Sequence, residues 1–466
     1  MLFSDLESLT DCTDLLIFED EPTIFTEEYV VEFVETALHL MIEYTEEYPQ
    51  VVSDPDFPDI LLDEIRELVY IQFEDHISIF NAGDDIEDDI NDILDDALTI
   101  FLSTFYPDKL YNKGQESIGY EITDKEIDEI EEKIQRLRGM PQPVQRTPAW
   151  YQFRWNLITA SNAWKAFETQ SSMNQLIYEK CQPLKSGQDG VEEEVKMVNV
   201  NSPLHWGQKY EPLTVMVYER DYNTTVEDFG CIQHSQYSFL GASPDGIVID
   251  KVSGRFGRML EIKNVVSREI TGIPKKEYWT QMQLQMEVCD LDDCDFLETK
   301  FTEYPDEASF LNDTHVNENG CSDLMLSSDN KTKGIILYFH TKEGSPFYIY
   351  KPLHIVTPKD AHEWEDTELG KYESHPYNYT FLKFIYWKLD VISCVLVARD
   401  RIWFKNNIQQ LEKVWKIIEE ERVSGYEHRA PNRKQRKEPS KPFVEQQSQG
   451  CLLHFTKIIK SDASLS

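Results

Sequence analysis

Several features common in other proteins are missing from this 466-residue sequence. No apolar run approaches the ~18 residues that a membrane-spanning helix needs, and the best candidate, 391–398, is short. The opening segment MLFSDLESLT has no basic region ahead of an apolar stretch, so we expect no signal peptide. The 8 cysteines include no CxxC pair, which disfavours zinc-ribbon and redox-motif proteins. We therefore expect an intracellular protein with reduced thiols and no membrane partner.

Basic residues are nearly absent from the first quarter of the chain. Residues 1–108 contain 31 Asp or Glu and a single basic residue, Arg66, which gives a net charge of −30. The remaining 54 acidic and 44 basic residues give residues 109–466 a net charge of −10. The overall charge of −40 argues against a nucleic-acid-binding protein, but such an average describes neither part.

The acidic part has the periodicity of amphipathic helices. Apolar residues recur at helical spacing, with acids on the other face, in the segments 30–41, 61–73 and 84–102. We predict about four or five helices packed as a bundle over residues 1–140. This bundle is expected to be a structural or partner-docking domain, and its partner is unknown.

The composition changes near residues 140–147. Glu126–Arg138 is expected to form one more helix, and Pro141, Pro143 and Pro148 block its continuation. From Thr147 the pattern is mixed: it predicts short strands, among them 246–250, 258–264 and 294–301, a helix over 278–289, and mostly helix over 379–418. We place a second domain at 147–422 and a basic flexible tail at 423–466.

The expected strand Arg258–Asn264 carries the first candidate for chemistry. Side chains alternate between the two faces of a strand, so Glu261 and Lys263 point the same way. A carboxylate can hold a divalent metal, and a neighbouring ammonium can offset the charge that develops during phosphodiester hydrolysis. By itself, Glu-x-Lys is more typical of an exposed ion pair that contributes little.

A second carboxylate lies just upstream. Asp245 follows Ser243-Pro244 at a tight turn between two strand-like runs, and a hairpin can bring it beside Glu261. Asp-Gly alone is also an ordinary hairpin turn. Two carboxylates with a lysine in the order Asp, Glu-x-Lys match the PD-(D/E)xK nuclease signature, and their oxygen ligands suit Mg²⁺ or Mn²⁺.

With its flanking motifs, the segment 147–302 resembles the phage lambda exonuclease and YqaJ-type viral recombinase family of PD-(D/E)xK nucleases. The motifs appear in the family's order: Trp150 and Arg154 with Ile158-Thr159-Ala160-Ser161, Trp206-Gly207 with Tyr210-Glu211, Ser243-Pro244-Asp245-Gly246, Leu260-Glu261-Ile262-Lys263, and Tyr278 with Gln281 and Gln283. The resemblance implies an α+β fold, restriction-endonuclease-like, in which an α/β/α nuclease core surrounds a central mixed sheet. The all-α acidic domain precedes this core and is not part of it.

The resemblance also assigns roles to individual residues. Asp245, Glu261, Lys263 and Gln281 would be catalytic. A Mg²⁺ ion, with Mn²⁺ as the alternative, would be held by Glu211, Asp245, Glu261 and the backbone carbonyl of Ile262. Arg154, Ser161 and Ser243 would bind the DNA phosphate; Arg suits forked phosphate contacts, and Ser161 is expected to cap a helix starting at Asn162.

The sequence departs from the family in two ways. The connection from Asp245 to Glu261 carries a longer hairpin than the minimal family version. Some relatives, including CRISPR-associated nucleases, carry a four-cysteine iron–sulfur cluster. Here the nearest pair is Cys289 and Cys294, with no clustered cysteines after it, so we expect no such cluster.

The tail contains a candidate for partner binding. Gln449, Leu452 and Phe455 fit the Gln-x-x-Leu-x-x-Phe box with which proteins bind sliding clamps, although the second aromatic is replaced by Thr456. A chance match in a flexible tail is the alternative. The basic run 429–441 before it is compatible with nuclear import, with a phosphate-binding tether, or with simple solvation.

The expected function is a metal-dependent exonuclease that degrades duplex DNA from a 5′ end in viral recombination, repair or replication. An endonuclease of the same superfamily and a non-catalytic adaptor that binds a sliding clamp are the alternatives. For a nuclease, the acidic domain has a further interpretation, a DNA-like surface that competes for the substrate groove. Homo-oligomerisation is also compatible with the family, and a viral protein would act in the host cytoplasm or nucleus.

Overall fold

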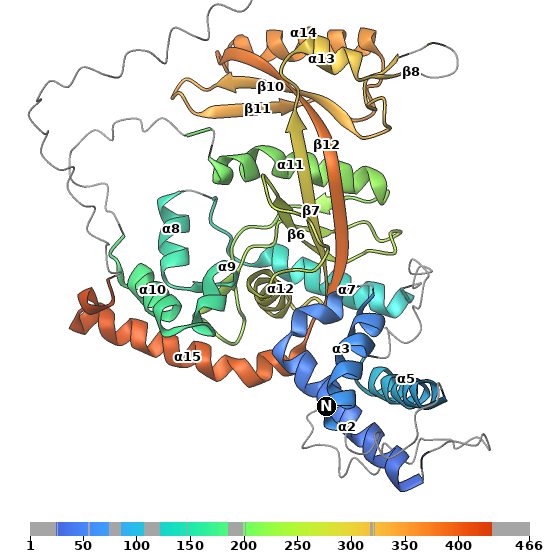
Figure 1. Ribbon diagram of the computed structural model, residues 1–466. Coiled ribbons are helices and arrows are strands. Elements are labelled where there is room, and N and C mark those ends of the chain that lie inside the picture. The colour runs from blue at the N-terminus through green and yellow to red at the C-terminus, as the bar shows by residue number, and fades with distance from the viewer. Residues whose placement is uncertain are drawn as a thin grey trace, which may run out of the picture.

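The computed structural model describes residue 25 and residues 27–54, 56–73, 85–106, 122–145, 147–184, 199–200, 202–316, 320 and 322–430. Its centre is a seven-stranded mixed sheet with the strand order β11-β10-β12-β7-β6-β5-β2. Figure 1 shows two of these strands, β7 and β12, running side by side through the middle of the molecule. The strands are β2 (Val226–Glu227), β5 (Gly246–Val248), β6 (Met259–Asn264), β7 (Asp293–Glu303), β10 (Lys333–His340), β11 (Pro346–Tyr350) and β12 (Thr380–Ala398).

Helices cover both faces of the sheet at β6. Leu260 and Ile262 pack with Tyr218 of α11 (Pro203–Asp221) on one face. Met259, the neighbour of Leu260 in the strand, belongs to the core cluster that contains Trp279 of α12 (Lys276–Cys289). The alternation of a strand therefore places Glu261 and Lys263 on the α12 face. This arrangement confirms the expected α+β architecture with a central mixed sheet between helices.

A second, small sheet lies beside α12 and has the order β1-β4-β3. Its strands are β1 (Ile158–Thr159), β3 (Ile232–Gln233) and β4 (Leu240–Ala242). β1 pairs in parallel with β4, which joins the segment after Arg154 to the segment before Asp245. Around it lie α8 (Pro148–Trp155), α9 (Ala160–Ala163), η3 (Trp164–Ala166) and α10 (Gln170–Cys181).

The prediction of a mostly helical segment over 379–418 is wrong in its first half. Residues 380–398 form the 19-residue strand β12, and only α15 (Arg401–Ser424) is helical. β12 pairs with β10 along Thr380–Lys388 and with β7 along Trp387–Ala398. These long pairings satisfy the backbone of an unusually long strand, and they are not visible in the local periodicity of the sequence.

The acidic segment folds as a helical bundle, as predicted. Its helices are α2 (Glu27–Glu47), η2 (Pro49–Ser53), α3 (Phe57–Gln72) and α5 (Asp85–Phe105). Their apolar stripes form a core of their own, with Phe33, Met41, Ile65 and Leu98 among the buried residues. The bundle touches the mixed domain at the start of α12, where Lys276 Nζ donates to the carbonyl oxygen of Glu47 at 3.3 Å.

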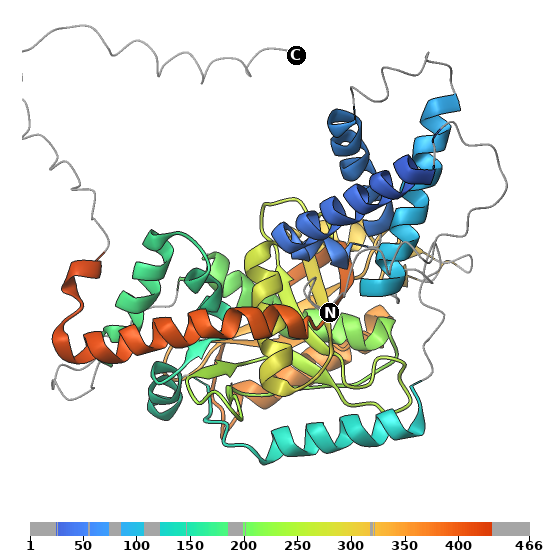
Figure 2. The same cartoon turned by 90° about the horizontal axis from the view of Figure 1, so that it is seen from below.

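Helix α7 (Asp124–Gly139) begins at Thr123, which forms a capping box with Glu126. We grouped this helix with the acidic domain, but its buried residues Ile134 and Leu137 belong to the core of the mixed domain. Figure 2 shows α7 apart from α2, α3 and α5, along the far side of the mixed domain. The packing therefore places α7 with the second domain.

The region between β7 and β12 adds a cap at one end of the sheet. It contains α13 (Glu307–Asn312), β8 (His315–Val316), β9 (Ser322–Asp323) and α14 (Pro358–Glu373). Phe310 and Ala361 pack with Ile335 of β10 in a separate apolar cluster. This cap lies outside the segment that carries the family motifs.

Order continues past Val423, where we expected the flexible tail to begin. α15 is followed by η4 (Glu427–Arg429), and Arg429 donates to Glu421 at 2.6 Å and also bonds Asn174. These contacts fix the first residues of the predicted tail on α10 and α15. The clamp-binding candidates Gln449, Leu452 and Phe455 lie outside the described residues, so that box stays a prediction. No helix in the described part of the chain is both long enough and apolar enough to cross a lipid bilayer.

Candidate active site

The two carboxylates of the predicted motif meet at the hairpin of β5 and β6. Asp245 directly precedes β5, and its backbone nitrogen donates to the carbonyl oxygen of Leu260 at 3.1 Å. Its side chain turns toward the same strand, because Oδ2 accepts a 2.7 Å hydrogen bond from the backbone nitrogen of Ile262. The tight turn thus places Asp245 against the strand that carries Glu261.

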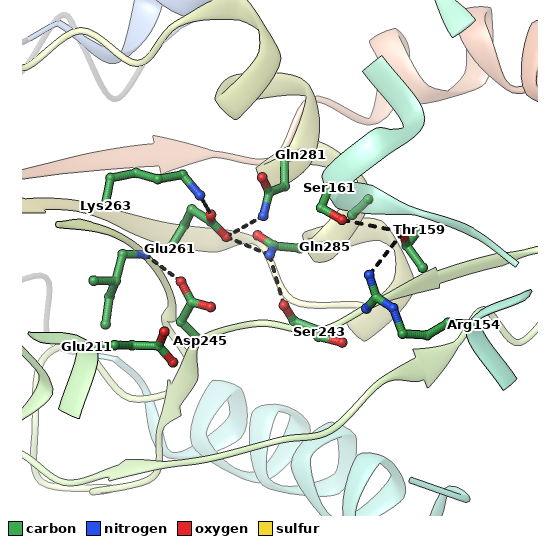
Figure 3. A pocket seen from close by; sticks show the side chains of 12 residues that line it. Arg154, Thr159, Ser161, Glu211, Ser243, Asp245, Glu261, Lys263, Gln281 and Gln285 are labelled. Atoms are coloured by element: carbon green, nitrogen blue, oxygen red, sulfur yellow. Dashed lines mark hydrogen bonds and ion pairs between the residues drawn. The ribbon is translucent and has the colours of Figure 1, made fainter. Parts of the chain in front are cut away.

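Glu261 lies at the centre of a hydrogen-bond network and is only 1% exposed. Oε1 of Glu261 accepts from Nζ of Lys263, its neighbour on the same face of β6. Oε2 accepts from Nε2 of Gln281 at 2.8 Å and from Nε2 of Gln285 at 2.7 Å. Figure 3 shows Lys263 and the two glutamines approaching the carboxylate from opposite sides. These three hydrogen bonds hold the Glu261 carboxylate in one orientation.

The three glutamines of helix α12 contact two different parts of the structure. Gln281 and Gln285 are one turn apart and face Glu261. Gln283, which the family motif includes, faces away and donates to the carbonyl oxygen of Ala398 at 2.9 Å. Its role here is to join α12 to the end of β12.

The predicted phosphate-binding residues come from three elements. Arg154, in the last turn of α8, lies with its guanidinium 4.7 Å from the ring centroid of Trp150 and donates to Oγ1 of Thr159 at 3.4 Å. Ser243 is in the turn before Asp245, and its buried hydroxyl finds no hydrogen-bond partner within the described part of the chain. Ser161 lies in α9, with its hydroxyl 3.4 Å from that of Thr159.

The prediction that Ser161 caps a helix starting at Asn162 is wrong. The cap of α9 is Thr159, whose backbone nitrogen donates to Oδ1 of Asn162 at 3.2 Å. Because α9 starts earlier than expected, Ser161 is inside its first turn. Its hydroxyl is therefore not required as the cap.

These residues line one pocket of about 270 Å³. The structure brings together every predicted site residue of the mixed domain: Arg154, Ser161, Glu211, Ser243, Asp245, Glu261, Ile262, Lys263 and Gln281. Figure 3 shows them converging from α8, α9, α11, α12 and the hairpin of β5 and β6. The pocket also takes in Thr159, Ala160 and Gln285, to which we had assigned no role.

The pocket brings three carboxylates together, of which Glu261 is buried, Asp245 is partly buried and Glu211 is exposed. Burial raises the pKa of Asp245 well above its usual value, and the charges of Glu261 and Glu211 raise it further. For Lys263, burial opposes the charged form, but Glu261 and Asp245 outweigh this effect and raise the pKa of the ammonium. The site thus holds three carboxylates against their mutual repulsion, with one lysine as a partial counter-charge.

This donor set fits a divalent metal ion. Carboxylate oxygens are hard ligands, and a dication near Asp245, Glu211 and Glu261 would relieve the repulsion that raises the pKa of Asp245. Among the described residues, however, no three His, Cys, Asp or Glu side chains already stand within common reach of one ion.

The comparison with known families agrees with the motif order. Residues 149–292 match the YqaJ-like viral recombinase domain. The match includes every residue that lines the pocket. It confirms the family resemblance that we drew from the motifs. The helical bundle, the cap at 304–379 and helix α15 lie outside the YqaJ-like segment.

Individual relatives extend the comparison. An uncharacterized protein, R354, of Acanthamoeba polyphaga mimivirus is 29% identical over 317 residues, which are 61% of this chain and 54% of that protein. The chain therefore spans about half the length of this relative. Among solved structures, the alkaline exonuclease LHK-Exo of Laribacter hongkongensis is 18% identical with a TM-score of 0.30, over 60% of this chain and 95% of that one. Its complex with dAMP gives a TM-score of 0.29 at the same identity.

Gln285 is the pocket residue on α12 to which the sequence alone gave no role, although it lies one turn after Gln281. Its spacing of four from Gln281 places both on one helical face, and this was the available signal. Thr159 was part of the Ile-Thr-Ala-Ser motif, but its role as the cap beside Arg154 depends on where α9 begins. The helix start was the part that the sequence left uncertain.

Proposed function

We propose that this chain is a divalent-metal-dependent deoxyribonuclease that degrades duplex DNA from a 5′ end. The observation that carries the proposal is the meeting of Asp245, Glu261 and Lys263 in one pocket that also contains Arg154 and Ser243. A carboxylate pair with a lysine supports phosphodiester hydrolysis, and an arginine nearby supports the binding of a terminal phosphate.

Asp245, Glu211, Glu261 and the carbonyl oxygen of Ile262 are the groups that would hold Mg²⁺, with Mn²⁺ as the alternative. When bound, such an ion polarises the phosphodiester and lowers the pKa of water, which favours hydrolysis. Ile262 contributes in a second way, because its backbone nitrogen fixes Oδ2 of Asp245 at 2.7 Å. We expect no further cofactor, and the absence of an iron–sulfur cluster stays a prediction.

Lys263 supplies positive charge next to the reacting phosphate. Its Nζ also lies 4.8 Å from the ring centroid of Tyr278, which limits where the ammonium can move. With Oε1 of Glu261 bound to a metal in its present orientation, Lys263 would be free to face the substrate. It then offsets negative charge on the phosphate and donates hydrogen bonds to it.

Arg154, Ser161 and Ser243 would hold the phosphate at the end of the strand being cut. Arg154 is held by Trp150 and Thr159, and the hydroxyl of Ser243, which no described residue bonds, is available to a phosphate oxygen. A binding site for a terminal phosphate favours cutting from an end over cutting within a chain. This reasoning supports an exonuclease, and the match to the YqaJ-like viral recombinase domain supports a role in viral recombination, repair or replication.

The test uses two duplexes with Mg²⁺, one linear and labelled at either the 5′ or the 3′ end, the other closed and circular. An exonuclease with the proposed polarity releases the 5′ label early, shortens the linear duplex and leaves the circle intact. Cutting of the circle would show an endonuclease instead. An adaptor without catalytic activity would leave both duplexes unchanged at every metal concentration.

A further inference from the structure

Gln285 is buried in the pocket and joins two parts of it. It is 0% exposed, and its single amide nitrogen donates to Oε2 of Glu261 at 2.7 Å and to the carbonyl oxygen of Ser243 at 3.2 Å. A side-chain amide nitrogen carries two hydrogens, and both are used here. The two partners are acceptors, so only this orientation of the amide satisfies them.

The hydrogen bond from Gln285 helps to fix the orientation of the Glu261 carboxylate. Within the described residues, Oε2 takes two amide donors, from Gln281 and Gln285, whereas Oε1 takes only the ammonium of Lys263. A carboxylate has about four acceptor sites, so the remaining capacity lies mainly on Oε1. The two glutamines therefore leave Oε1 on the side of Lys263 and oppose rotation of the carboxylate.

The second bond of Gln285 reaches the turn between β4 and β5. Ser243 is in this turn, and Asp245 follows two residues later and bonds β6 through Ile262. Glu261 is thus tied to Asp245 along β6 and, through Gln285, to the turn that carries Ser243. Movement of one carboxylate relative to the other would require this amide to break a buried bond.

We propose that Gln285 is a positioning residue that fixes Glu261 and the Ser243 turn in the geometry required for a divalent metal. The inference rests on the proposed function, because it assumes that Glu261 is a metal ligand. Groups that hold a ligating carboxylate by hydrogen bonds typically contribute 10–100-fold to metal affinity. Neither an apolar nor an acidic side chain of similar length can replace a donor that serves two acceptors.

Gln283 provides a matched control on the same helix. It is 1% exposed and also makes two hydrogen bonds, from its Nε2 to the carbonyl oxygen of Ala398 at 2.9 Å and to its Oε1 from the backbone nitrogen of Asp400 at 2.6 Å. The residue type, the burial and the number of bonds match those of Gln285. Its partners belong to the junction of β12 and α15, away from the pocket.

The experiment measures Mn²⁺ binding to the full chain without DNA, by electron paramagnetic resonance of the free ion. Gln285→Met and Gln283→Met are compared with the wild type, and the Tm of each is recorded. We expect both variants to lower Tm to a similar extent. Gln285→Met should raise the Kd for Mn²⁺ about 10–100-fold, whereas Gln283→Met should leave this Kd within about twofold of the wild type.

The inference is overturned if Gln285→Met binds Mn²⁺ as tightly as the wild type, or if both variants lose affinity equally. If Gln285→Met does not fold, Gln285→Asn provides the same comparison, since it keeps the amide but is too short to reach both acceptors. If the wild type cuts DNA and binds Mn²⁺ while the variant is unaffected, only the positioning role fails. If the wild type neither binds Mn²⁺ nor cuts DNA, the proposed function fails with it.

Discussion

Arg422 and Trp155 are 267 residues apart in the chain and touch in the fold. Nη2 of Arg422 donates to the carbonyl oxygen of Trp155 at 2.6 Å, and its guanidinium lies 3.5 Å from the centroid of that ring. Arg422 also donates to the carbonyl oxygen of Lys180, whose Nζ donates to the carbonyl oxygen of Arg154 at 2.9 Å. Helix α15, outside the YqaJ-like segment, thereby fixes the end of α8 and with it the candidate phosphate-binding arginine.

Replacing Arg422 should therefore weaken substrate binding from a distance. In Arg422→Met the carbonyl groups of Trp155 and Lys180 lose a charged donor, so the end of α8 that carries Arg154 is held less firmly. The variant should therefore raise KM for a 5′-phosphorylated duplex about tenfold, with a smaller change in kcat. The free energy of unfolding should fall by about 2 kcal/mol. Arg401→Met, on the exposed side of the same helix, is the control and should change neither quantity. Equal effects of the two substitutions would show that Arg422 does not act on the pocket through α8.

Arg154 should determine the preference for a phosphorylated end. A charge-assisted contact from arginine to phosphate is worth about 1.5–3 kcal/mol, which corresponds to roughly 10–100-fold in kcat/KM. Arg154→Ala should lose this factor on duplexes with a 5′-phosphate and change little on duplexes with a 5′-hydroxyl. The initial rates of nucleotide release from the two substrates measure the ratio. An unchanged ratio would mean that Arg154 has only a structural role beside Trp150.

Lys333 should affect stability without affecting the site. This 0%-exposed residue of β10 donates to the carbonyl oxygens of Phe310 and Asp313 and to Oγ1 of Thr314, each at 2.6 Å. Lys333→Met removes three buried hydrogen bonds from a charged donor, although Oγ1 of Thr314 still donates to the carbonyl oxygen of Phe310 at 3.1 Å. We therefore expect a loss of about 3 kcal/mol in the free energy of unfolding, measured with urea. DNA cleavage at low temperature should stay near that of the wild type, because the pocket is elsewhere. A variant as stable as the wild type would show that these bonds are not formed.

The same lysine gives a prediction about pH. Burial lowers the pKa of Lys333 to about 8, below its unfolded value of 10.5. Between these two values the unfolded chain binds more protons than the folded chain, so the contribution of Lys333 to stability rises with pH through this window. The difference in unfolding free energy between wild type and Lys333→Met should therefore be larger at pH 10 than at pH 7. A difference that is constant or that falls with pH would contradict the assigned shift.

The acidic bundle should oppose DNA binding through its charge. A chain that starts at residue 122 keeps α7, which belongs to the core of the mixed domain, and removes most of the negative charge. We expect this shorter chain to bind duplex DNA more tightly than the full chain at low salt. The gain should shrink as salt rises, because the Debye length falls to about 8 Å near 0.15 M. Equal affinities at low salt would exclude both simple repulsion and competition by a DNA-like surface.

The local spacing of residues was sufficient to predict the centre of the site. Glu261 and Lys263 share a face because a strand alternates, and Asp245 joins them because a tight turn precedes β5. Both relations span few residues and follow from backbone geometry. The bundle helices were equally accessible, since each has its own apolar stripe.

The parts that the sequence did not reveal depend on contacts between distant residues. The run Thr380–Ala398 is mostly apolar and aromatic, with Lys383, Lys388 and Asp390 as its charged residues, and only its pairing with β7 and β10 makes it a strand. Helix α7 has a clear periodicity, but its periodicity does not tell which of two cores it joins. The bond from Gln285 to Ser243 likewise needs the fold, because 42 positions separate the two residues.

The most direct test of this account is the rate at which Lys263→Ala releases nucleotides from a linear duplex carrying a 5′-phosphate, in the presence of Mg²⁺. Lys263 lines the pocket beside Glu261 without being one of the proposed metal ligands, so the variant should still bind Mn²⁺ and DNA. We expect its rate to fall at least about 100-fold below that of the wild type. Release at the wild-type rate by Lys263→Ala would show that hydrolysis, if the chain performs it, takes place elsewhere.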